Sequence, residues 1–415
     1  MTSTTSEAVL AQRNSVFDPA AALAAIEAVV GPLRAARPEQ PVTLHEPTFE
    51  GAERAYVIDA IDSTFVSSVG EYVNRFEIEL AQICGVGYAV AAMNGTAALH
   101  ICLLLAGVEP EDEVLAPALT FVATANSIAY CGAIPHFCDA SELTLGLDPA
   151  KLARHLAETC EMSDGFCRNR ATGRRVKAAM PMHTFGHPVE LDELIDVCAR
   201  WNIALVEDNA EGLGSLYKGK PLGSFGLVSG VSFNGNKIVT TGGGGAILTN
   251  DAAIARKAKH LTTTAKTPHR WAFEHDQLGY NYRMPNLNAA LGCAQLERLP
   301  GFLAAKRALA RRYHDAFAGV PGARVFVDAP FAQSNYWLVA MILDEPDLII
   351  RDEFLSACHE KGMLTRPIWG SMHRQPLYRD CPRMDLSTTD SLEGRVVNLP
   401  SSPFIETAFG TAHAD

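Results

Sequence analysis

IALVEDNAEGLGSLYKGKPLGSFGLVSGVSFNGNK, residues 203–237, contains two short apolar runs that each end in polar side chains. The first run leads into Glu207 and Asp208, and the second leads into Ser232 and then Lys237. Short β-rich runs alternate with helical stretches in the same way from about residue 86 to residue 250. This alternation is typical of an α/β fold in which helices cover both faces of a mostly parallel sheet.

The expected elements follow one another in the order of such a fold. We expect strands at 86–93, 113–119, 133–140, 176–183, 203–210 and 230–234, and helices at 94–107, 120–132 and 191–202. In open α/β sheets, ligands gather at the carboxyl ends of the strands. The polar residues at those ends are Asn94, Thr120, His183, Asp208 and Asn234.

The C-terminal part of the chain has a different pattern, which indicates a second domain. A helix-rich stretch covers 286–319, strand-like runs follow at 320–343, and a further helix covers 351–362. We therefore expect three parts: an N-terminal tail and helix, a large domain, and a small C-terminal α+β domain. Their expected bounds are 1–44, 45–300 and 301–415.

The composition disfavours several classes of protein. The formal net charge of −12 argues against a nucleic-acid-binding surface, which usually needs a basic face. The ten cysteines form no C-x-x-C pair, which disfavours structural zinc and a disulfide scaffold and favours reduced thiols in the cytoplasm. The N-terminus lacks the pattern of a signal peptide, and no apolar run approaches the roughly 18 residues of a membrane span. We therefore expect no membrane contact.

NGTAAL, residues 94–99, lies where a strand ends and a helix begins. Free backbone N–H groups and the helix dipole make such a turn a site for an anion, and Gly95 lets the anion approach closely. An ordinary helix N-cap has the same pattern, so this signal is weak by itself.

Asp208 and Lys237 are the residues whose chemistry is most specific. A carboxylate at a buried strand end is costly unless it meets a cation, and a protonated pyridine nitrogen is such a partner. A lysine after a strand can attach covalently to a carbonyl compound. Ser232 can donate to a phosphate, and the glycines at 242–245 permit close approach of the backbone. The alternatives are an N-cap aspartate and an exposed lysine in a glycine hairpin.

MHTFGHP contains His183 and His187, which are four residues apart. On a helix this spacing suits a metal, but Gly186 and Pro188 disfavour a helix here. We therefore expect no metal. His183 is interpreted as a residue that lines a cleft, and a plain loop histidine is the alternative.

These segments resemble the DegT/StrS-type sugar-nucleotide aminotransferases from about residue 45 to residue 403. The motifs that carry the resemblance are MNGTAAL, PALTFVATANSI, HTFGHP, residues 206–251 and LGYNYRMPNLNAALGCAQLERL. FVSSVGEYVNRFE and TRPIWGSMHRQPLY further resemble the branch that aminates UDP-linked 4-keto-6-deoxy-N-acetylhexosamines. This finer resemblance makes Trp369 and His373, with His183, candidate substrate residues.

The resemblance implies the aspartate-aminotransferase-like fold, fold type I, with pyridoxal phosphate as cofactor. Lys237 matches the lysine that attaches to the cofactor, and Asp208 matches the acid beside the pyridine nitrogen. Glu211 occupies a position near the phenolic oxygen of the ring, and Phe121 matches the aromatic residue that stacks on it. Gly95, Thr96 and Ser232 match the phosphate cradle.

The resemblance also implies a homodimer with shared active sites, because Asn281 matches a residue that reaches the phosphate of the neighbouring subunit. The sequence departs from the family at Gly243, where relatives often carry Glu. It also departs at Asn234 and Asn236, where His and Thr or Ser are frequent. These departures concern the details of the lysine loop.

The implied function is transfer of an amino group from an amino acid, by analogy glutamate, to the 4-keto carbon of a nucleotide-linked 4-keto-6-deoxy sugar. Amination at C3 is one alternative. A related sugar dehydratase is disfavoured because that branch has His in place of Lys237. A non-catalytic regulator is disfavoured because it would not require Lys237, Asp208 and Ser232 together. A nicotinamide dehydrogenase is disfavoured because no strand is followed by G-x-G-x-x-G.

Overall fold

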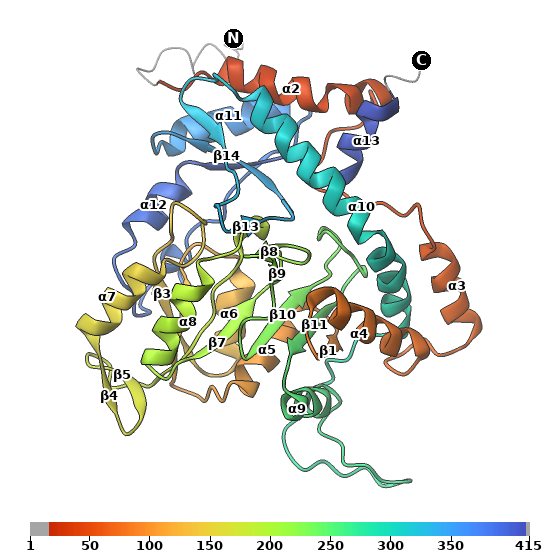
Figure 1. The fold of residues 1–415 in the computed structure, drawn as a ribbon, viewed down its shortest axis with the longest axis vertical. Helices are drawn as coiled ribbons and strands as arrows, with labels where there is room; N and C mark the ends of the chain where they lie inside the picture. The colour runs from red at the N-terminus through yellow and green to blue at the C-terminus, as the bar shows by residue number, and fades with distance from the viewer. Residues whose placement is uncertain (1–15, 412–415) are drawn as a thin grey trace.

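The structure is a computed structural model that describes residues 16–411. The expected N-terminal tail therefore lies outside the described residues, apart from its last few positions. Figure 1 shows a large α/β part in the lower half of the view and a smaller part above it, and the first and last described helices, α2 and α13, both lie at the smaller part.

A seven-stranded sheet forms the centre of the large part, in the order β1-β11-β10-β7-β6-β2-β3. Its strands are Tyr88–Ala92 (β1), Gly245–Thr249 (β11), Val228–Ser232 (β10), Ala204–Asp208 (β7), Val176–Ala179 (β6), Glu113–Pro117 (β2) and Ile134–Cys138 (β3). All neighbouring pairs from β10 to β3 are parallel, and β11 is antiparallel to both of its neighbours. The predicted mostly parallel sheet is confirmed, and every expected strand is present.

Alternate residues of each strand pack on opposite faces of the sheet, as the period of two requires. Val206 of β7 and Ile247 of β11 pack with α5 (Gly95–Leu105), α6 (Val122–Tyr130) and α9 (Ala252–Thr262). On the other face, Leu205 packs with α7 (Pro149–Thr159) and α8 (Leu191–Arg200). Leu248 packs there with α4 (Glu71–Cys84) and α10 (Asn286–Ala316). The sheet is therefore covered on both faces.

The smaller part is built on an antiparallel sheet of four strands in the order β12-β14-β16-β15. Its strands are Ala323–Val325, Val339–Leu343, Val396–Leu399 and Arg366–Pro367 in that order. The helices α11 (Leu348–Glu360), α12 (Ser387–Glu393) and α13 (Pro403–Thr411) belong to this end of the chain. The remaining elements are α3 (Glu53–Asp62), β4 (Cys160–Ser163), β5 (Phe166–Asn169), β8 (Leu216–Tyr217), β9 (Lys220–Pro221), β13 (Ala332–Gln333) and two short 3-10 turns, Thr184–Gly186 and Met372–Arg374.

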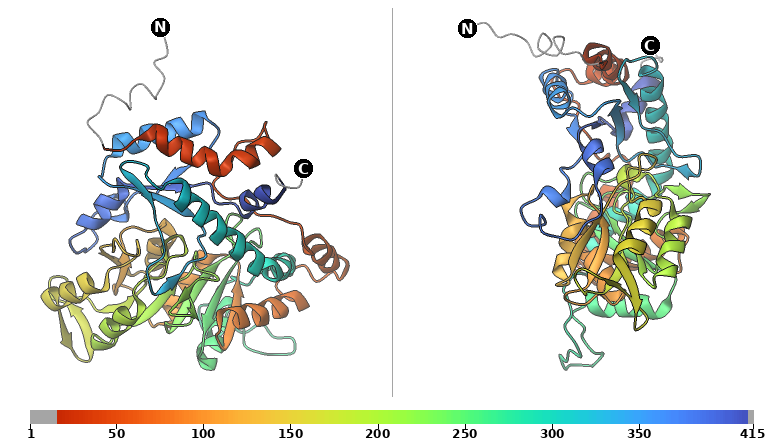
Figure 2. Two further views of the ribbon diagram at one scale, coloured as in Figure 1. Left: turned by 45° about the horizontal axis from the view of Figure 1, so that its top comes forward. Right: turned by 90° about the vertical axis from the view of Figure 1, so that its left-hand side faces the viewer.

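The N-terminal helix α2, Pro19–Ala36, packs into the core of the smaller part rather than standing apart from it (Figure 2). Asp18 caps this helix by accepting from the N–H groups of Ala20 and Ala21, at 3.0 Å each. Its apolar face shares one hydrophobic cluster with α10, α11, α13 and the small sheet. The expected division at 1–44 therefore differs from the structure.

The expected boundary near residue 300 also differs, because α10 passes through it as one helix of 31 residues with Pro300 inside. The first half of α10 covers the large sheet, and the second half packs against α2 in the small core. α10 therefore runs without interruption from one part into the other. Within the described residues, α2 is the one helix whose length and composition would suit a membrane span. Its buried face makes it a core helix of the smaller part.

Candidate active site

A cavity of about 330 Å³ lies at the carboxyl ends of β7 and β10. Eight of the residues predicted from the sequence line it: Gly95, Thr96, Phe121, Asp208, Glu211, Ser232, Lys237 and Trp369. They come from strand ends and helix starts that are distant in the sequence. The arrangement is the one that a parallel sheet produces, since the ends of parallel strands meet at one edge.

The start of α5 forms one wall of the cavity. Asn94 caps the helix, and its Oδ1 accepts from the N–H of Ala97 at 2.8 Å. The N–H groups of Gly95 and Thr96 belong to the first turn, so they have no acceptor within the helix. A Cβ on Gly95 would lie 2.8 Å from Cβ of Ser232. Glycine is therefore required for α5 and β10 to approach, and this approach places the Ser232 hydroxyl beside the helix N-terminus.

Asp208 ends β7 in a buried position. Its Oδ2 accepts from the hydroxyl of Thr124 at 2.8 Å, and its Oδ1 accepts from the N–H of Ala210 at 3.2 Å. Burial raises the pKa of the Asp208 carboxyl, while these hydrogen bonds and the charge of Lys237 oppose that rise. A cation placed against Asp208 would stabilise its charged form.

Lys237 lies between a carboxylate and an aromatic ring. Its Nζ is 3.1 Å from Oε1 of Glu211 and 3.7 Å from the ring centroid of Trp337. The other oxygen of Glu211 accepts from the N–H of Phe185 at 2.9 Å. Burial raises the pKa of the Glu211 carboxyl, and Lys237 is the main influence that opposes this rise. The amine is thus held inside the cavity by a buried partner.

The glycine run after Lys237 serves close packing more than it serves space for a ligand. A Cβ on Gly245 would lie 2.4 Å from the carbonyl oxygen of Asn94, and one on Gly244 would lie 2.1 Å from Oγ1 of Thr241. Gly242 has a φ of +78° and makes the turn. Gly243 has open space around its Cα, so the Glu that relatives often carry there could be accommodated.

Three predicted residues do not line this cavity. His183 has no exposure, and its Nε2 is 3.2 Å from Oε2 of Glu207. Its Nδ1 accepts from the N–H of Val189 at 3.4 Å, so Nε2 carries the proton that Glu207 accepts. A substrate does not reach this enclosed ring, which differs from the predicted substrate role.

His373 does not line this cavity either. Its Nε2 lies 3.3 Å from Oδ1 of Asp390, and burial lowers the pKa of the imidazole. Asn281 is exposed, its backbone pairs with that of Thr263 in an isolated antiparallel bridge, and the residue does not line the cavity of its own chain. This position leaves the Asn281 side chain available to a neighbouring subunit.

Sequence reasoning missed two residues that contact the central pair. Thr124, which bonds Asp208, lies one helical turn after Thr120, and the two hydroxyls are 2.7 Å apart. That spacing of four residues, with Thr120 just before α6 and Thr124 in its first turn, could have indicated that the two hydroxyls lie close together. Trp337 lies 100 positions after Lys237 and carries no local signal, because only the fold brings it to the amine.

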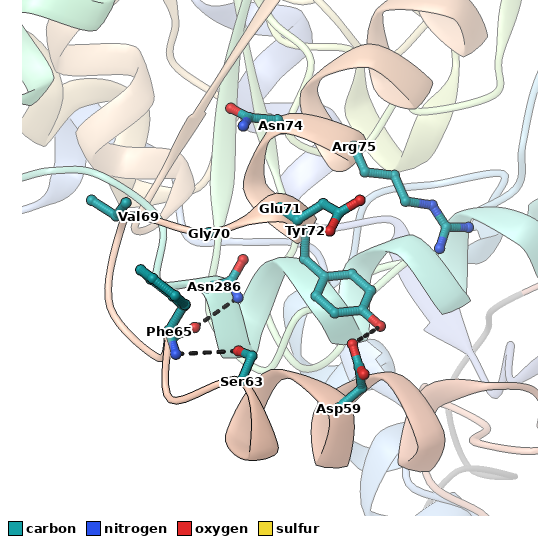
Figure 3. A pocket seen from close by; sticks show the side chains of 10 residues that line it. All are labelled: Asp59, Ser63, Phe65, Val69, Gly70, Glu71, Tyr72, Asn74, Arg75 and Asn286. Atoms are coloured by element: carbon teal, nitrogen blue, oxygen red, sulfur yellow. Dashed lines mark hydrogen bonds between the residues drawn. The ribbon is translucent and has the colours of Figure 1, made fainter.

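A second cavity of about 620 Å³ lies between α3, α4 and the start of α10 (Figure 3). Tyr72 donates to Oδ2 of Asp59 across it at 2.9 Å. Asn286 donates to the carbonyl of Phe65 at 2.7 Å, and Gly70 leaves the room that the Asn286 amide fills. The segment FVSSVGEYVNRFE therefore lines this second cavity, whereas Trp369 lines the first.

Comparison with known proteins agrees with this geometry. Residues 47–409 match the DegT/DnrJ/EryC1/StrS aminotransferase family. The chain belongs to this family. It is 37% identical to the GDP-perosamine synthase of Caulobacter vibrioides over 362 residues, which cover 87% of this chain and 93% of that protein. It is 35% identical to the GDP-perosamine synthase of Escherichia coli O157:H7, with the same shares covered. The solved aminotransferase TlmJ of Streptoalloteichus hindustanus has a TM-score of 0.78 and 27% identity, and the match covers 90% of this chain and 100% of that one.

The protein is therefore a sugar aminotransferase of fold type I that depends on pyridoxal phosphate. The predicted family, fold and cofactor are confirmed, and the alternative of a non-catalytic regulator is excluded.

The residues of the cavity fit this cofactor. The free N–H groups at the start of α5 and the Ser232 hydroxyl suit a phosphate. The buried Asp208 suits a protonated pyridine nitrogen, since a cation there would offset the burial that raises the pKa of its carboxyl. The amine of Lys237 lies in the same cavity and suits the aldehyde.

Proposed function

We propose that this enzyme transfers an amino group from glutamate to the 4-keto carbon of a nucleotide-linked 4-keto-6-deoxy sugar, for amino-sugar and surface-glycan biosynthesis. One observation carries the proposal: a lysine amine, a buried carboxylate and a helix N-terminus share one cavity at the carboxyl edge of the sheet. The free state of all ten cysteines supports a cytoplasmic enzyme.

Each side chain of the cavity has a proposed role. When bound, the cofactor supplies the electron sink for the reaction. Lys237 would hold the cofactor covalently, and its freed amine would move the proton at the donor's Cα. Asp208 would face the pyridine nitrogen, and its carboxylate would favour the protonated form of that nitrogen. Glu211 holds the amine of Lys237, and Phe121, half exposed at the cavity, covers the ring face.

The nucleotide is the finer part of the proposal. Three similar proteins of 34–37% identity are GDP-perosamine synthases, which favours a GDP-linked sugar. The resemblance of FVSSVGEYVNRFE and TRPIWGSMHRQPLY to the UDP branch makes a UDP-linked 4-keto-6-deoxy-N-acetylhexosamine the second candidate. We propose GDP first, because the similarity to the GDP-perosamine synthases covers 87% of the chain, whereas the resemblance to the UDP branch concerns two segments only.

The test is an assay with the purified protein, glutamate and a panel of 4-keto-6-deoxyhexoses linked to GDP, UDP or dTDP, with one 3-keto sugar nucleotide. Formation of 2-oxoglutarate and the mass of the aminated sugar are measured. We expect kcat/KM for the GDP sugar to exceed the others at least tenfold. A preference for the UDP sugar would select the second candidate, and turnover of the 3-keto sugar alone would contradict amination at C4.

We further propose that the enzyme is a homodimer with shared sites. Asn281 is exposed and does not line the cavity of its own chain, as expected of a residue that serves a partner subunit. Large apolar side chains are exposed on α3 and the loop after it, which suits a surface that another subunit covers. These residues are Ile58, Ile61, Phe65, Val66 and Val69.

A further inference from the structure

Trp337 has contacts that core packing alone does not require. Its ring lies against the charged end of Lys237, with Nζ 3.7 Å from the centroid. A cation at this distance from a tryptophan face is attracted by the ring quadrupole. The indole N–H donates to the carbonyl of Asn236 at 2.7 Å, which is the residue before the lysine. The ring plane is thus fixed relative to the backbone that carries Lys237.

Asn335 connects the two walls of the lysine site, one formed by Glu211 and the other by Trp337. Its Nδ2 donates to the carbonyls of Glu211 at 2.7 Å and Leu213 at 2.9 Å. Its Oδ1 accepts from the N–H of Trp337 at 2.7 Å. The residue is fully buried and every polar atom of its side chain has a partner. A single amide therefore sets the spacing between the Glu211 wall and the Trp337 wall.

The side chain of Asn335 packs tightly against the 3-10 turn Thr184–Gly186. A Cβ on Gly186 would lie 1.9 Å from Oδ1 of Asn335, so this position of the turn must be glycine. The neighbouring Phe185 has a φ of +54°, which is uncommon for a bulky residue, and donates from that strained position to Glu211. Strain of this kind persists where the surrounding structure fixes it.

We propose that Trp337 is a positioning residue of the active site. Together with Glu211, its ring holds the amine of Lys237 whenever that amine is not attached to the cofactor, and Asn335 keeps the two walls in register. The freed amine therefore stays within reach of the atoms between which it must move a proton. This inference rests on the proposed catalytic role of Lys237.

The first test measures the lysine itself, without turnover. Cofactor-free protein is treated briefly with formaldehyde and cyanoborohydride, and methylation of Lys237 is quantified by peptide mass spectrometry against the exposed Lys218. Trp337→Leu removes the ring that covers and attracts the amine, so we expect labelling to rise roughly three- to tenfold. Trp337→Phe keeps an aromatic face and should stay within about twofold of wild type. Trp201→Leu, which removes a partly buried tryptophan elsewhere, is the matched control and should show no change.

The second test separates positioning from a structural role. Trp337→Leu should lower kcat at least tenfold while KM for both substrates stays within twofold, and Trp337→Phe should recover most of kcat. Melting temperatures of all variants confirm that they fold. Should Trp337→Leu not fold, Trp337→Met replaces it, because its flexible chain fills an irregular gap without an aromatic face.

Two results would overturn the inference. One is Lys237 labelling in Trp337→Leu, or in Trp337→Met, that equals wild type and the Trp201→Leu control. The other is a loss of kcat in Trp337→Phe as large as in Trp337→Leu. Failure of the proposed function is a different result: the wild-type protein would turn over none of the keto sugars, while the labelling experiment still tests Trp337.

Discussion

Asp208 has almost no exposure to water, and burial raises the pKa of its carboxyl. A buried carboxylate without a cation is costly, and the site offers Thr124, the N–H of Ala210 and the nearby Lys237 to reduce that cost. A protonated pyridine nitrogen would complete the compensation. Asp208 therefore bears on both how well the cofactor fits the cavity and the reactivity that we propose for the bound cofactor.

Replacing Asp208 by Asn should reduce the rate much more than cofactor binding. The amide keeps the shape and can still bond Thr124, but it has no charge to hold the pyridinium proton. We expect kcat to fall at least a hundredfold, about 2.7 kcal/mol in barrier, with the cofactor dissociation constant within tenfold. Stopped assays and fluorescence titration measure the two. A rate within tenfold of wild type would contradict the role.

Replacing Lys237 by Ala should abolish transamination and leave a folded protein. We propose that this amine attaches to the cofactor and moves the proton, and no other lysine lines the cavity among the described residues. Borohydride reduction of the loaded protein, followed by mass spectrometry, should trap cofactor in the wild type and none in the variant. The role would be disproved by near-wild-type turnover together with a trapped adduct.

Lys306 is a buried amine that differs from Asp208, because its surroundings offset little of the cost of removing its charge from water. It is 1% exposed, its Nζ donates to the carbonyl of Ser401 at 2.5 Å, and burial lowers its pKa well below the ordinary value. The unfolded chain therefore binds an extra proton between the folded pKa and about 10.4, so stability rises with pH through that window.

We expect Lys306→Met to remove this pH dependence. Between pH 7 and 10 the free energy of unfolding of the wild type should rise relative to the variant, by up to about 1.4 kcal/mol per pH unit. At pH 7 the variant should be the more stable of the two, because it buries no amine. Urea denaturation at several pH values measures both. Parallel stability curves would show that the amine keeps its ordinary pKa in the folded state.

At the scale of elements, the site depends on how closely α5, β10 and β11 approach one another. Glycines at 95 and 245 permit this contact, since a Cβ on either would meet backbone or side-chain atoms of the neighbouring element within 3 Å. The approach places the first turn of α5 beside Ser232. The helix dipole and the hydroxyl then act on the same anion.

Gly95→Ala should therefore weaken cofactor binding more than it weakens the fold. Its Cβ would push Ser232 away from the helix N-terminus, and we expect the affinity for pyridoxal phosphate to fall at least tenfold, about 1.4 kcal/mol. Gly243→Ala is the matched control, because a Cβ there meets open space and φ is not in the left-handed region. Titration of the cofactor-free proteins measures the affinities. Equal affinities in the two variants would show that the close approach does not form the cradle.

The elements that sequence patterns predicted are those with strong local signals. The six predicted strands and three predicted helices between 86 and 234 lie where apolar runs alternate with helical stretches, whereas α7 and the short strands β4, β5, β8 and β9 in the same range are not among the predicted elements. β11 was not predicted as a strand, because Ala246–Leu248 is short and follows four glycines. Its antiparallel pairing with β10 follows from the turn at Gly242, which returns the chain along β10, and its pairing with β1 is a long-range contact of the fold.

At the scale of the whole molecule, α10 connects the large sheet with the small core, and α2 closes that core from the other end of the chain. The smaller part is thus formed from both termini. Exposed apolar side chains remain on α3 and the following loop, and two of them, Phe65 and Val69, line the second cavity (Figure 3). A second subunit would cover this surface in the proposed dimer.

Subunit complementation tests the shared site. Lys237→Ala and Asn281→Asp proteins, each inactive alone, are mixed and allowed to exchange subunits. Asn281→Asp sets a carboxylate against the partner's cofactor phosphate. If sites are shared, one site of each heterodimer has both defects and the other has none, so activity should partly return. No recovery, with exchange shown by mass spectrometry, would mean that Asn281 does not serve a partner's site.

The sequence alone determined the α/β class, the strand-end positions of Asp208 and Ser232, and the place of Lys237, because apolar periodicity and strand ends are local properties. It also indicated the phosphate turn at residues 94–96. Only the tertiary structure decided that His183 is enclosed against Glu207, that α2 belongs to the small core and that Trp337 covers Lys237. These contacts join residues far apart in the chain, or residues whose exposure depends on what packs over them. No local pattern encodes such contacts, since they follow from the packing of the complete fold.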